Sequence, residues 1–474
     1  MSKHTILLIT LLLFAPISLI ANDSPQQFLR DSIPPTWRYE SSFSQTLPTD
    51  DRWWNNFNDT CLDSLMNIAI ANNYDLLIAQ KRIVLAKAAL RIAQSNFFPS
   101  ATLGFGWNKI RTPGNITSED SPSTNSDYFD LGLNFNWEID VFGHINYQSK
   151  SKKALWQATK SQYYGAMVTL CSNVATAYIN LRTWQMEFIV ATTHLKSQKA
   201  VLEMTETRFK SGLASMLDVS QAKMVYLSTL ASIAPLKASI ETQINSIAIL
   251  LGVYSNQLPA GVIDMRALPS VPTIIPVGLP IDLLRRRPDI KEAEYTIASY
   301  AAELGVAKKD FLPTLNLSGQ IGFKSHKIDK LFKDNSFGYS ISPTLSWTVF
   351  DGLNRKYQII SSKEQYMIGI DNYNNIVMTA VKETENAMIT YNYMVDETME
   401  LKGVTDEAFK SLQLSIDLYK RGLSAFTNVL SSQQSYLQYN NSLVVSKGRT
   451  LLALVSIYQA LGGGWENYEL NNNK

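Results

Sequence analysis

Charge, cysteine and histidine are all scarce in this sequence, and each shortage excludes a class of protein. Charged residues make up 18% of the 474 positions and the net charge is +2, so the charge balance does not predict nucleic acid as a partner. Cys61 and Cys171 are too few for a disulfide framework. An oxidising compartment would allow them to pair, but we expect two buried thiols. The histidines form no ligand-spaced pair, and phosphate loops and nucleophile elbows are absent, so we expect no metal, no cofactor and no enzymatic activity.

Long apolar runs are also rare, and the one at the start of the chain is short. Residues 5–21 are almost wholly apolar and a polar stretch begins at Asn22, which is typical of an export signal. A membrane-spanning helix needs about 20 residues, and Pro16 interrupts this run. We expect residues 1–21 to be a signal peptide.

Proline is absent from two long stretches, between Pro122 and Pro235 and after Pro343. A proline inside a helix costs about 3 kcal/mol, so these stretches permit long helices, and their apolar residues recur at three and four positions as in a helix. A helix of residues 144–210 would be about 100 Å long. The predicted helices are 60–97, 144–210, 216–251, 281–311, 353–420 and 425–461.

The sequence repeats itself. Asp75 aligns with Asp289 at an offset of 214 residues, and Gly212 aligns with Gly422 at an offset of 210. One unit has therefore been used twice. We place an amino-terminal segment at 22–59, the first unit at 60–265, the second at 266–466 and a short polar tail at 467–474.

Each unit also carries two segments in which apolar and polar residues alternate. From Phe129 to Ile139 the odd positions are apolar and the even ones mostly small or uncharged. Strands of about 9–11 residues with this pattern are typical of an outer-membrane barrel, although a soluble sheet with one buried face alternates in the same way. The polar connectors 109–127 and 324–336 are expected to be exposed loops. The predicted strands are 101–108, 128–140, 314–323 and 337–349.

Four strands are too few to close a barrel, since the smallest has about eight, and an open edge is not tolerated in lipid. The chain would have to assemble through its sheet, with eight strands as a dimer or twelve as a trimer. Side chains nearly fill an eight-stranded barrel, whereas a twelve-stranded one leaves a hole. The short helices, stacked end to end beside the long ones, would give each chain four columns that continue the barrel as a hollow cylinder.

Four motifs carry a resemblance to a known family. They are 283–290 (LLRRRPDI) with 311–313 (FLP), 53–57 (WWNNF), and two glycine-centred turns at 208–213 (RFKSGL) and 419–423 (YKRGL). Across about residues 36–466 the chain resembles the TolC/OprM-type outer-membrane factors of tripartite efflux pumps of the resistance-nodulation-division type.

The resemblance implies a homotrimer in the outer membrane of a Gram-negative-type cell. Its trimeric 12-stranded β-barrel would continue into a 12-helix periplasmic α-barrel with a mixed equatorial region. The channel would passively conduct exported small molecules from a periplasmic adaptor and an inner-membrane transporter. A soluble periplasmic coiled-coil protein, adaptor-like or structural, and a type I protein-secretion duct of the same fold remain as alternatives. No cysteine precedes Cys61, so we expect no lipid anchor of the kind that many relatives carry.

The resemblance also implies two sets of functional residues at the hairpin turns. Where some relatives have a pore-lining aspartate, this chain has Asn428, so an acidic ring is not expected there. The residues expected to dock the adaptor are Arg208, Lys210, Gly212, Leu213, Lys420, Gly422 and Leu423. Those expected to form a periplasmic gate are Asp218, Tyr419, Arg421 and Asn428.

Overall fold

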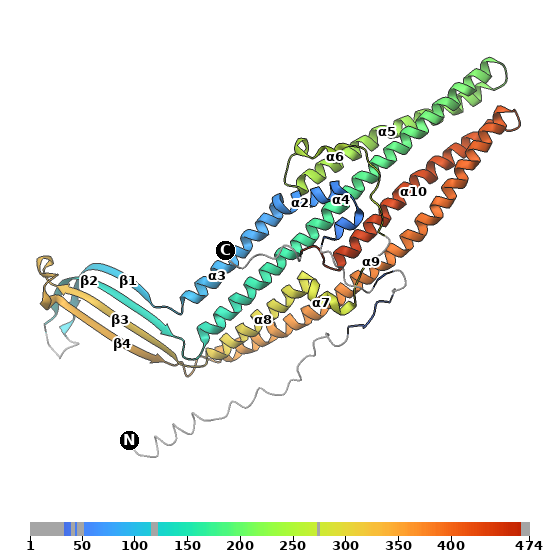
Figure 1. Cartoon of the computed structure of the whole chain (residues 1–474). Helices are drawn as coiled ribbons and strands as arrows, with labels where there is room; N and C mark the ends of the chain where they lie inside the picture. Colours follow the sequence, from blue (N-terminus) through green and yellow to red (C-terminus); the bar gives the residue numbers. More distant parts are fainter. Residues whose placement is uncertain (1–32, 39–42, 45–51, 115–121, 273–274, 466–474) are drawn as a thin grey trace.

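The computed structural model describes residues 33–38, 43–44, 52–114, 122–272 and 275–465. The expected signal peptide and polar tail lie outside these ranges, as does much of the segment 22–59. Within them the chain forms a long column of helices with a four-stranded sheet at one end (Figure 1).

Two helices are far longer than the average of about 11–12 residues. α4 spans His144–Lys210 and α9 spans Asn354–Lys420, and each has 67 residues. α5 (Met216–Leu250) and α10 (Phe426–Ala460) run back along them. All four agree with the predicted ranges to within one residue at each end.

The predicted helix 60–97 is wrong, because the chain forms two helices there. α2 spans Thr60–Asn72 and α3 spans Tyr74–Ser95, with Asn73 extended between them at φ −61° and ψ 126°. Asn73 Oδ1 accepts a hydrogen bond from Leu76 N at 3.0 Å, which caps α3. The residue that caps α3 is therefore Asn73, and Asp75 lies within the first turn of the helix.

The predicted helix 281–311 is also too long at its start. α8 spans Pro288–Lys309 and follows a single turn, α7, at Leu283–Arg286. Proline forces the residue before it out of the helical region, and Arg287 is extended at φ −73° and ψ 119°. Asp289 Oδ1 accepts a hydrogen bond from Ile290 N at 2.9 Å, as expected for an acid in the first turn.

The helices form four columns (Figure 1). α4 packs against α3 and α5, and also against α8 and α10, while α9 packs against α8 and α10. The short helices are therefore stacked in pairs, α3 with α5 and α8 with α10, beside the two long helices.

Both stacked joints are made in the same way. Asn73 Nδ2 donates to Leu250 O at 2.9 Å, and the Arg287 guanidinium donates to Ala460 O at 3.0 Å. The donors are 214 residues apart and the acceptors 210, which are the offsets of the repeat. Each bond uses a carbonyl at the end of a helix, where no donor of the same helix is available.

The sheet has the antiparallel order β1-β2-β3-β4. β1 runs from Ser100 to Thr112 and β2 from Thr124 to Ile139, so both strands extend into the connector 109–127 that was predicted as a loop. β3 is Thr314–Ser325. β4 is Phe337–Ser346 and stops before the predicted residue 349.

One face of the sheet is apolar and exposed to the surroundings. In register, Leu103 lies opposite Leu133, and Ile321 lies opposite both Leu133 and Tyr339. Leu103 is 71% exposed and Tyr339 75%, which is unusual for large apolar side chains that recur across a whole face.

The other face carries a row of glycines. Gly104, Gly132, Gly322 and Gly338 are successive register partners on the four strands. A Cβ on Gly322 would lie 2.3 Å from Leu131 O. Glycine therefore allows neighbouring strands to approach closely at this row.

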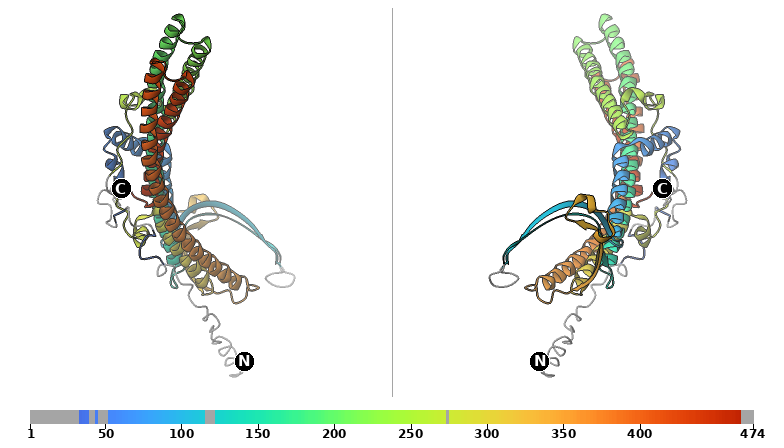
Figure 2. Two further views of the ribbon diagram at one scale, coloured as in Figure 1. Left: turned by 90° about the vertical axis from the view of Figure 1, so that its right-hand side faces the viewer. Right: turned by 90° about the vertical axis from the view of Figure 1, so that its left-hand side faces the viewer.

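A belt of short helices and loops covers one side of the columns near the joints (Figure 2). We use "belt" for residues 52–72, 251–272, 275–287 and 461–465. Trp54 and Phe57 of the belt are fully buried. Arg182 of α4, also buried, donates to Gly261 O at 2.5 Å and Asp264 O at 2.7 Å, which fastens the belt to the long helix.

The two cysteines are free and buried, which confirms the prediction. Burial raises the pKa of the Cys171 thiol to about 12. Among the described residues, no helix combines the length and the apolar character that crossing a membrane would need.

Two glycine substitutions should have effects of opposite sign on stability. Gly252 follows α5 at φ +67°, and a Cβ there would lie 2.4 Å from Asn72 O. Gly252→Ala should therefore destabilise the protein by more than the about 1–2 kcal/mol of left-handed strain alone. Gly403 of α9 has open space around it, so Gly403→Ala should stabilise by about 0.5–1 kcal/mol. Thermal unfolding in detergent measures both, and equal shifts would contradict the close approach at the joint.

Candidate functional site at the hairpin tips

The hairpins α4–α5 and α9–α10 turn at equivalent glycines at the end of the molecule away from the sheet (Figure 1). Gly212 has φ +71° and Gly422 has φ +75°. Leu213 N donates to Arg208 O at 2.8 Å, and Leu423 N donates to Leu418 O at 2.9 Å. Both turns have the form in which glycine ends a helix without a steric penalty.

The tips are apolar as well as basic. Leu213 is 65% exposed and Leu423 is 71% exposed, and Lys210 and Lys420 are exposed beside them. All seven residues expected to dock the adaptor thus lie at or next to the two turns, although Arg208 is only partly exposed.

Arg208 connects the two hairpins. Its guanidinium donates to Lys420 O at 3.0 Å and lies 5.0 Å from the centre of the Tyr419 ring. Tyr419 is buried in a small apolar cluster with Phe426 and Val429. The sequence predicted Tyr419 as a gate residue but assigned Arg208 to docking, so the contact between them was missed.

Asp218 also lies near Tyr419, but its hydrogen bonds stay within its own hairpin. Ser215 and Asp218 form a reciprocal cap on α5, with bonds of 3.1 Å and 3.2 Å. Burial raises the pKa of Tyr419, the Asp218 carboxylate raises it further, and Arg208 works against both. Within a single chain, Asp218 therefore acts on Tyr419 through its charge.

The other two predicted gate residues have local partners. Arg421 Nε lies 3.1 Å from Asp417 Oδ2 on the same helix. Asn428 Nδ2 donates to Ser424 Oγ at 2.9 Å. Both are exposed, so in a single chain neither crosses to the other hairpin.

Between the tips and the main core, α4 and α10 meet along a seam of buried and half-buried polar side chains. We use "polar seam" for His194, Gln198, Gln433, Tyr436 and Asn440. Neither amide atom of Gln198 has a hydrogen-bond partner, nor does Nε2 of Gln433, although both side chains are buried. Unmade hydrogen bonds of this kind cost free energy, so the two hairpins are held together only weakly here.

His194 is the titratable centre of the polar seam. Its ring packs 4.6 Å from the Tyr436 ring, and Nε2 lies 3.2 Å from Asn440 Nδ2. Burial lowers the pKa of His194 below its ordinary value of 6.5. Polar residues at 194, 198 and 205 interrupt the apolar stripe at helical spacing, a signal that the sequence alone contains.

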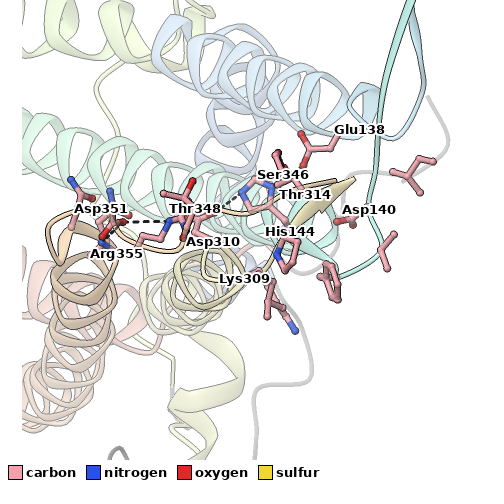
Figure 3. Close-up of a pocket in the computed structure, with 17 residues that line it drawn as sticks. Glu138, Asp140, His144, Lys309, Asp310, Thr314, Ser346, Thr348, Asp351 and Arg355 are labelled. Carbon is pink, nitrogen blue, oxygen red and sulfur yellow. Dashed lines mark hydrogen bonds and ion pairs between the residues drawn. The ribbon is translucent and has the colours of Figure 1, made fainter. Parts of the chain in front are cut away.

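A second polar site joins the sheet to the helices (Figure 3). It is a cavity of about 260 Å³ where β2, β3 and β4 meet α4, α8 and α9. His144 Nε2 lies 3.0 Å from Asp310 Oδ1, and Nδ1 lies 3.8 Å from Glu138 Oε1. Asp140 accepts hydrogen bonds from Ile145 N and Asn146 N at the start of α4. These contacts fix the angle between the sheet and the columns.

The side chains around that cavity do not converge on a common point. His144 presents its two ring nitrogens to different carboxylates. Within the described residues, no three or more histidine, cysteine or acidic side chains are grouped so as to hold a metal ion. The cavity is best described as an ion-paired junction.

Comparison with known proteins gives matches along most of the chain. The model of a family described as outer membrane efflux protein matches residues 65–253 and 279–463. The two matched stretches fall one in each predicted unit.

Two efflux proteins illustrate the similarity. Over 414 residues the chain is 29% identical to the solvent efflux pump outer membrane protein SrpC of Pseudomonas putida, with 86% of each chain covered. It is 26% identical to the cation efflux system protein CusC of Escherichia coli, covering 87% of this chain and 88% of that protein.

Solved structures agree with these relatives. The outer-membrane channel OprN superposes with a TM-score of 0.85 at 28% identity, covering 91% of this chain and 97% of that one. The MtrE outer membrane channel of Neisseria gonorrhoeae has a TM-score of 0.79 at 22% identity, covering 91% and 98%; this match concerns the fold alone. The match to OprN confirms the predicted class, a mixed α and β membrane protein.

The polar seam should loosen in mild acid. Because the pKa of His194 is lowered in the folded protein, the unfolded chain takes up the proton first, and stability falls as pH drops below about 6.5. His194→Gln should reduce this loss between about pH 7 and pH 5. Thermal unfolding across this range tests it.

His326→Gln is the matched control, because His326 is an exposed histidine at the end of β3. It should leave the pH profile unchanged. If His194→Gln unfolds with the same pH dependence as the unmodified protein, His194 does not titrate with folding.

Proposed function

Because the chain belongs to the outer membrane efflux protein family, we propose that it is the outer-membrane channel of a tripartite efflux pump. It passively conducts exported small molecules that a periplasmic adaptor and an inner-membrane transporter deliver. The relatives' names support this assignment, since SrpC is an efflux pump outer membrane protein and CusC a cation efflux system protein. The relatives are channel components, which favours conduction over catalysis.

The free edges of the sheet are the observation that carries the proposal. Among the described residues, β1 pairs only with β2 and β4 only with β3, so each outer edge leaves backbone donors and acceptors open. The apolar face suits lipid, but unpaired backbone groups do not. Three copies joined edge to edge give twelve strands and a closed barrel wide enough to conduct.

The helices offer a matching contact surface. Ile78, Leu85 and Ile92 lie seven residues apart on α3, at the side of the columns, and are 50%, 69% and 69% exposed. A stripe at this spacing is typical of helices that pack side by side. The neighbouring copy in the trimer would cover it.

The trimer should depend on this stripe. Leu85→Lys together with Ile92→Lys places charges where the neighbouring copy packs, so the trimer should dissociate at a lower temperature. Migration of unheated and heated samples from the outer-membrane fraction measures it. Leu213→Lys is the control, since Leu213 is 65% exposed but lies at the tip. A wild-type chain that stays monomeric in aqueous extract without detergent would rule out the channel and favour the soluble alternative.

We propose that the contact of Arg208 with Tyr419 and Lys420 is the clasp that keeps the tip closed, with Asp218, Arg421 and Asn428 around it. The clasp joins the two hairpins of one chain at their free ends. Its loss would let the hairpins separate at the polar seam, where the pairing is weakest. The exposed Leu213 and Leu423 would remain available to an adaptor in either state.

Two sets of tip variants should separate gating from docking. Arg208→Ala and Tyr419→Ala should raise ion conductance in planar bilayers several-fold, and Asp218→Ala should raise it as well. Leu213→Arg with Leu423→Arg should leave conductance unchanged but abolish tolerance to toxic compounds in a strain that depends on the pump.

Lys223→Ala controls for charge loss on an exposed helix face and should change neither readout. Unchanged conductance in Arg208→Ala and Tyr419→Ala would remove the clasp. Full tolerance in the double leucine variant would remove the docking role.

A further inference from the structure

Positive charge is concentrated on α3 and the first part of α4. Residues 76–95 contain four lysines and arginines and no carboxylate, and residues 144–186 contain five and no carboxylate. The corresponding helices of the second unit, residues 288–309 and 354–396, mix acidic and basic residues. Apart from the buried Arg182, these cations give a chain with a net charge of only +2 a basic surface on one pair of columns.

Several of these cations share one face. Lys150, Lys153 and Lys160 are spaced three and seven residues apart, which places them on one side of α4. Lys87 lies on α3, which packs against α4. Burial lowers the pKa of Lys160, and the charge of Lys87 lowers it further. Arg91 is one turn further along α3 and is exposed, as are Lys150 and Lys153. We use "basic stripe" for these five residues.

The basic stripe lies on the side of the columns that carries the belt. Four residues after Lys160, Tyr164 packs against Trp465 of the belt with 4.5 Å between ring centres. The belt lies wholly to one side of the columns (Figure 2). If the columns surround a channel, this is the outer side, because the belt would obstruct the bore.

The stripe also begins close to the end of the apolar sheet that joins the helices. Trp137 and Trp347 occupy equivalent places there. The Trp137 indole N–H donates to Phe97 O, and the Trp347 indole N–H donates to Phe311 O, both at 3.0 Å. Tryptophan with a satisfied N–H is typical of the boundary between lipid and water. Two large apolar side chains beside these tryptophans are also exposed, Phe98 at 73% and Val141 at 57%.

Length along the helices places the stripe within reach of that boundary. Lys150 and Lys153 lie about 9 and 14 Å into α4, and Arg91 and Lys87 about 6 and 12 Å from the end of α3. The headgroup layer is about 5–8 Å thick, and the field of anionic lipids extends roughly another 8 Å. Lysine and arginine side chains are long enough to bridge the remaining distance.

We propose that the basic stripe binds the phosphate groups of anionic phospholipids in the leaflet that faces the periplasm. The inference rests on the proposed function, which puts the sheet in the membrane. Clusters of four or more lysines and arginines next to a membrane segment bind anionic lipid in this way. The partly buried Lys160, whose Nζ lies 4.0 Å from the Trp156 ring centre, lies at the end of the stripe that is farther from the sheet.

The experiment compares lipids on the purified trimer in a neutral detergent. Dioleoylphosphatidylglycerol should raise the unfolding temperature more than dioleoylphosphatidylcholine at equal mole fraction, and high salt should remove the difference. In the variant Lys87→Gln/Arg91→Gln/Lys150→Gln/Lys153→Gln, half-saturation by phosphatidylglycerol should need at least about tenfold more lipid. Inorganic phosphate at equal concentration should have no such effect, which separates a lipid headgroup from a free anion.

A charge-matched control changes four exposed lysines nearer the tips, Lys196, Lys199, Lys223 and Lys447, to glutamine. It should keep the wild-type response. An unchanged phosphatidylglycerol response in the stripe variant, or an equal response to inorganic phosphate in the wild type, overturns the inference. Conductance separates the two proposals: a trimer that conducts but lacks the lipid response fails only the inference, whereas a chain that never enters a bilayer fails the proposed function as well.

Discussion

The backbone hydrogen bonds at the edges of the sheet are the constraint on which the rest of the structure depends. In the part of the chain that the structure describes, β1 and β4 each have one partner strand, and a lipid environment offers no donor or acceptor to replace a second. Only further copies of the chain can supply it. Every copy therefore adds the same four columns at the same position relative to its sheet. If the strands of several copies form a ring, their helices must form a ring as well. The contact between His144 and Asp310, at the cavity where the sheet meets the helices, fixes the angle between the sheet and the columns.

The tandem repeat solves a problem of length. A stacked pair of short helices has to match one long helix, and the ends that meet in the middle leave carbonyls and N–H groups without partners. Asn73 and Arg287 close the two gaps with equivalent bonds to Leu250 and Ala460. At the second joint, Arg287 also pairs with Asp289 of α8 at 2.6 Å and with Glu383 of α9 at 2.9 Å. The joint therefore gives Arg287 and Asp289 of the arginine-proline-aspartate motif a structural role.

Features that depend on local pattern could be predicted from the sequence, and those that depend on a single side chain in space could not. The bounds of α4 and α9 follow from a long proline-free periodicity, and the turns follow from Gly212 and Gly422. The break at Asn73 was missed because asparagine fits a helix almost as well as its neighbours until Leu250 O offers it a partner. The strand ends were missed because polar residues at 109–112 continue the ladder through backbone bonds that do not depend on side-chain type.

The polar seam gives a physical reason why the tips and not the whole molecule would move. The main core runs continuously from the belt through α4 and α10, whereas the tip cluster is small and separate. Between them, Gln198 and Gln433 are buried without full pairing, so separating the hairpins there would return their amides to water and recover part of the cost of burial. A seam of leucines would lose apolar burial instead, at roughly 2 kcal/mol for each side chain. The placement of polar residues therefore lowers the cost of opening at the end where Arg208 holds the hairpins closed.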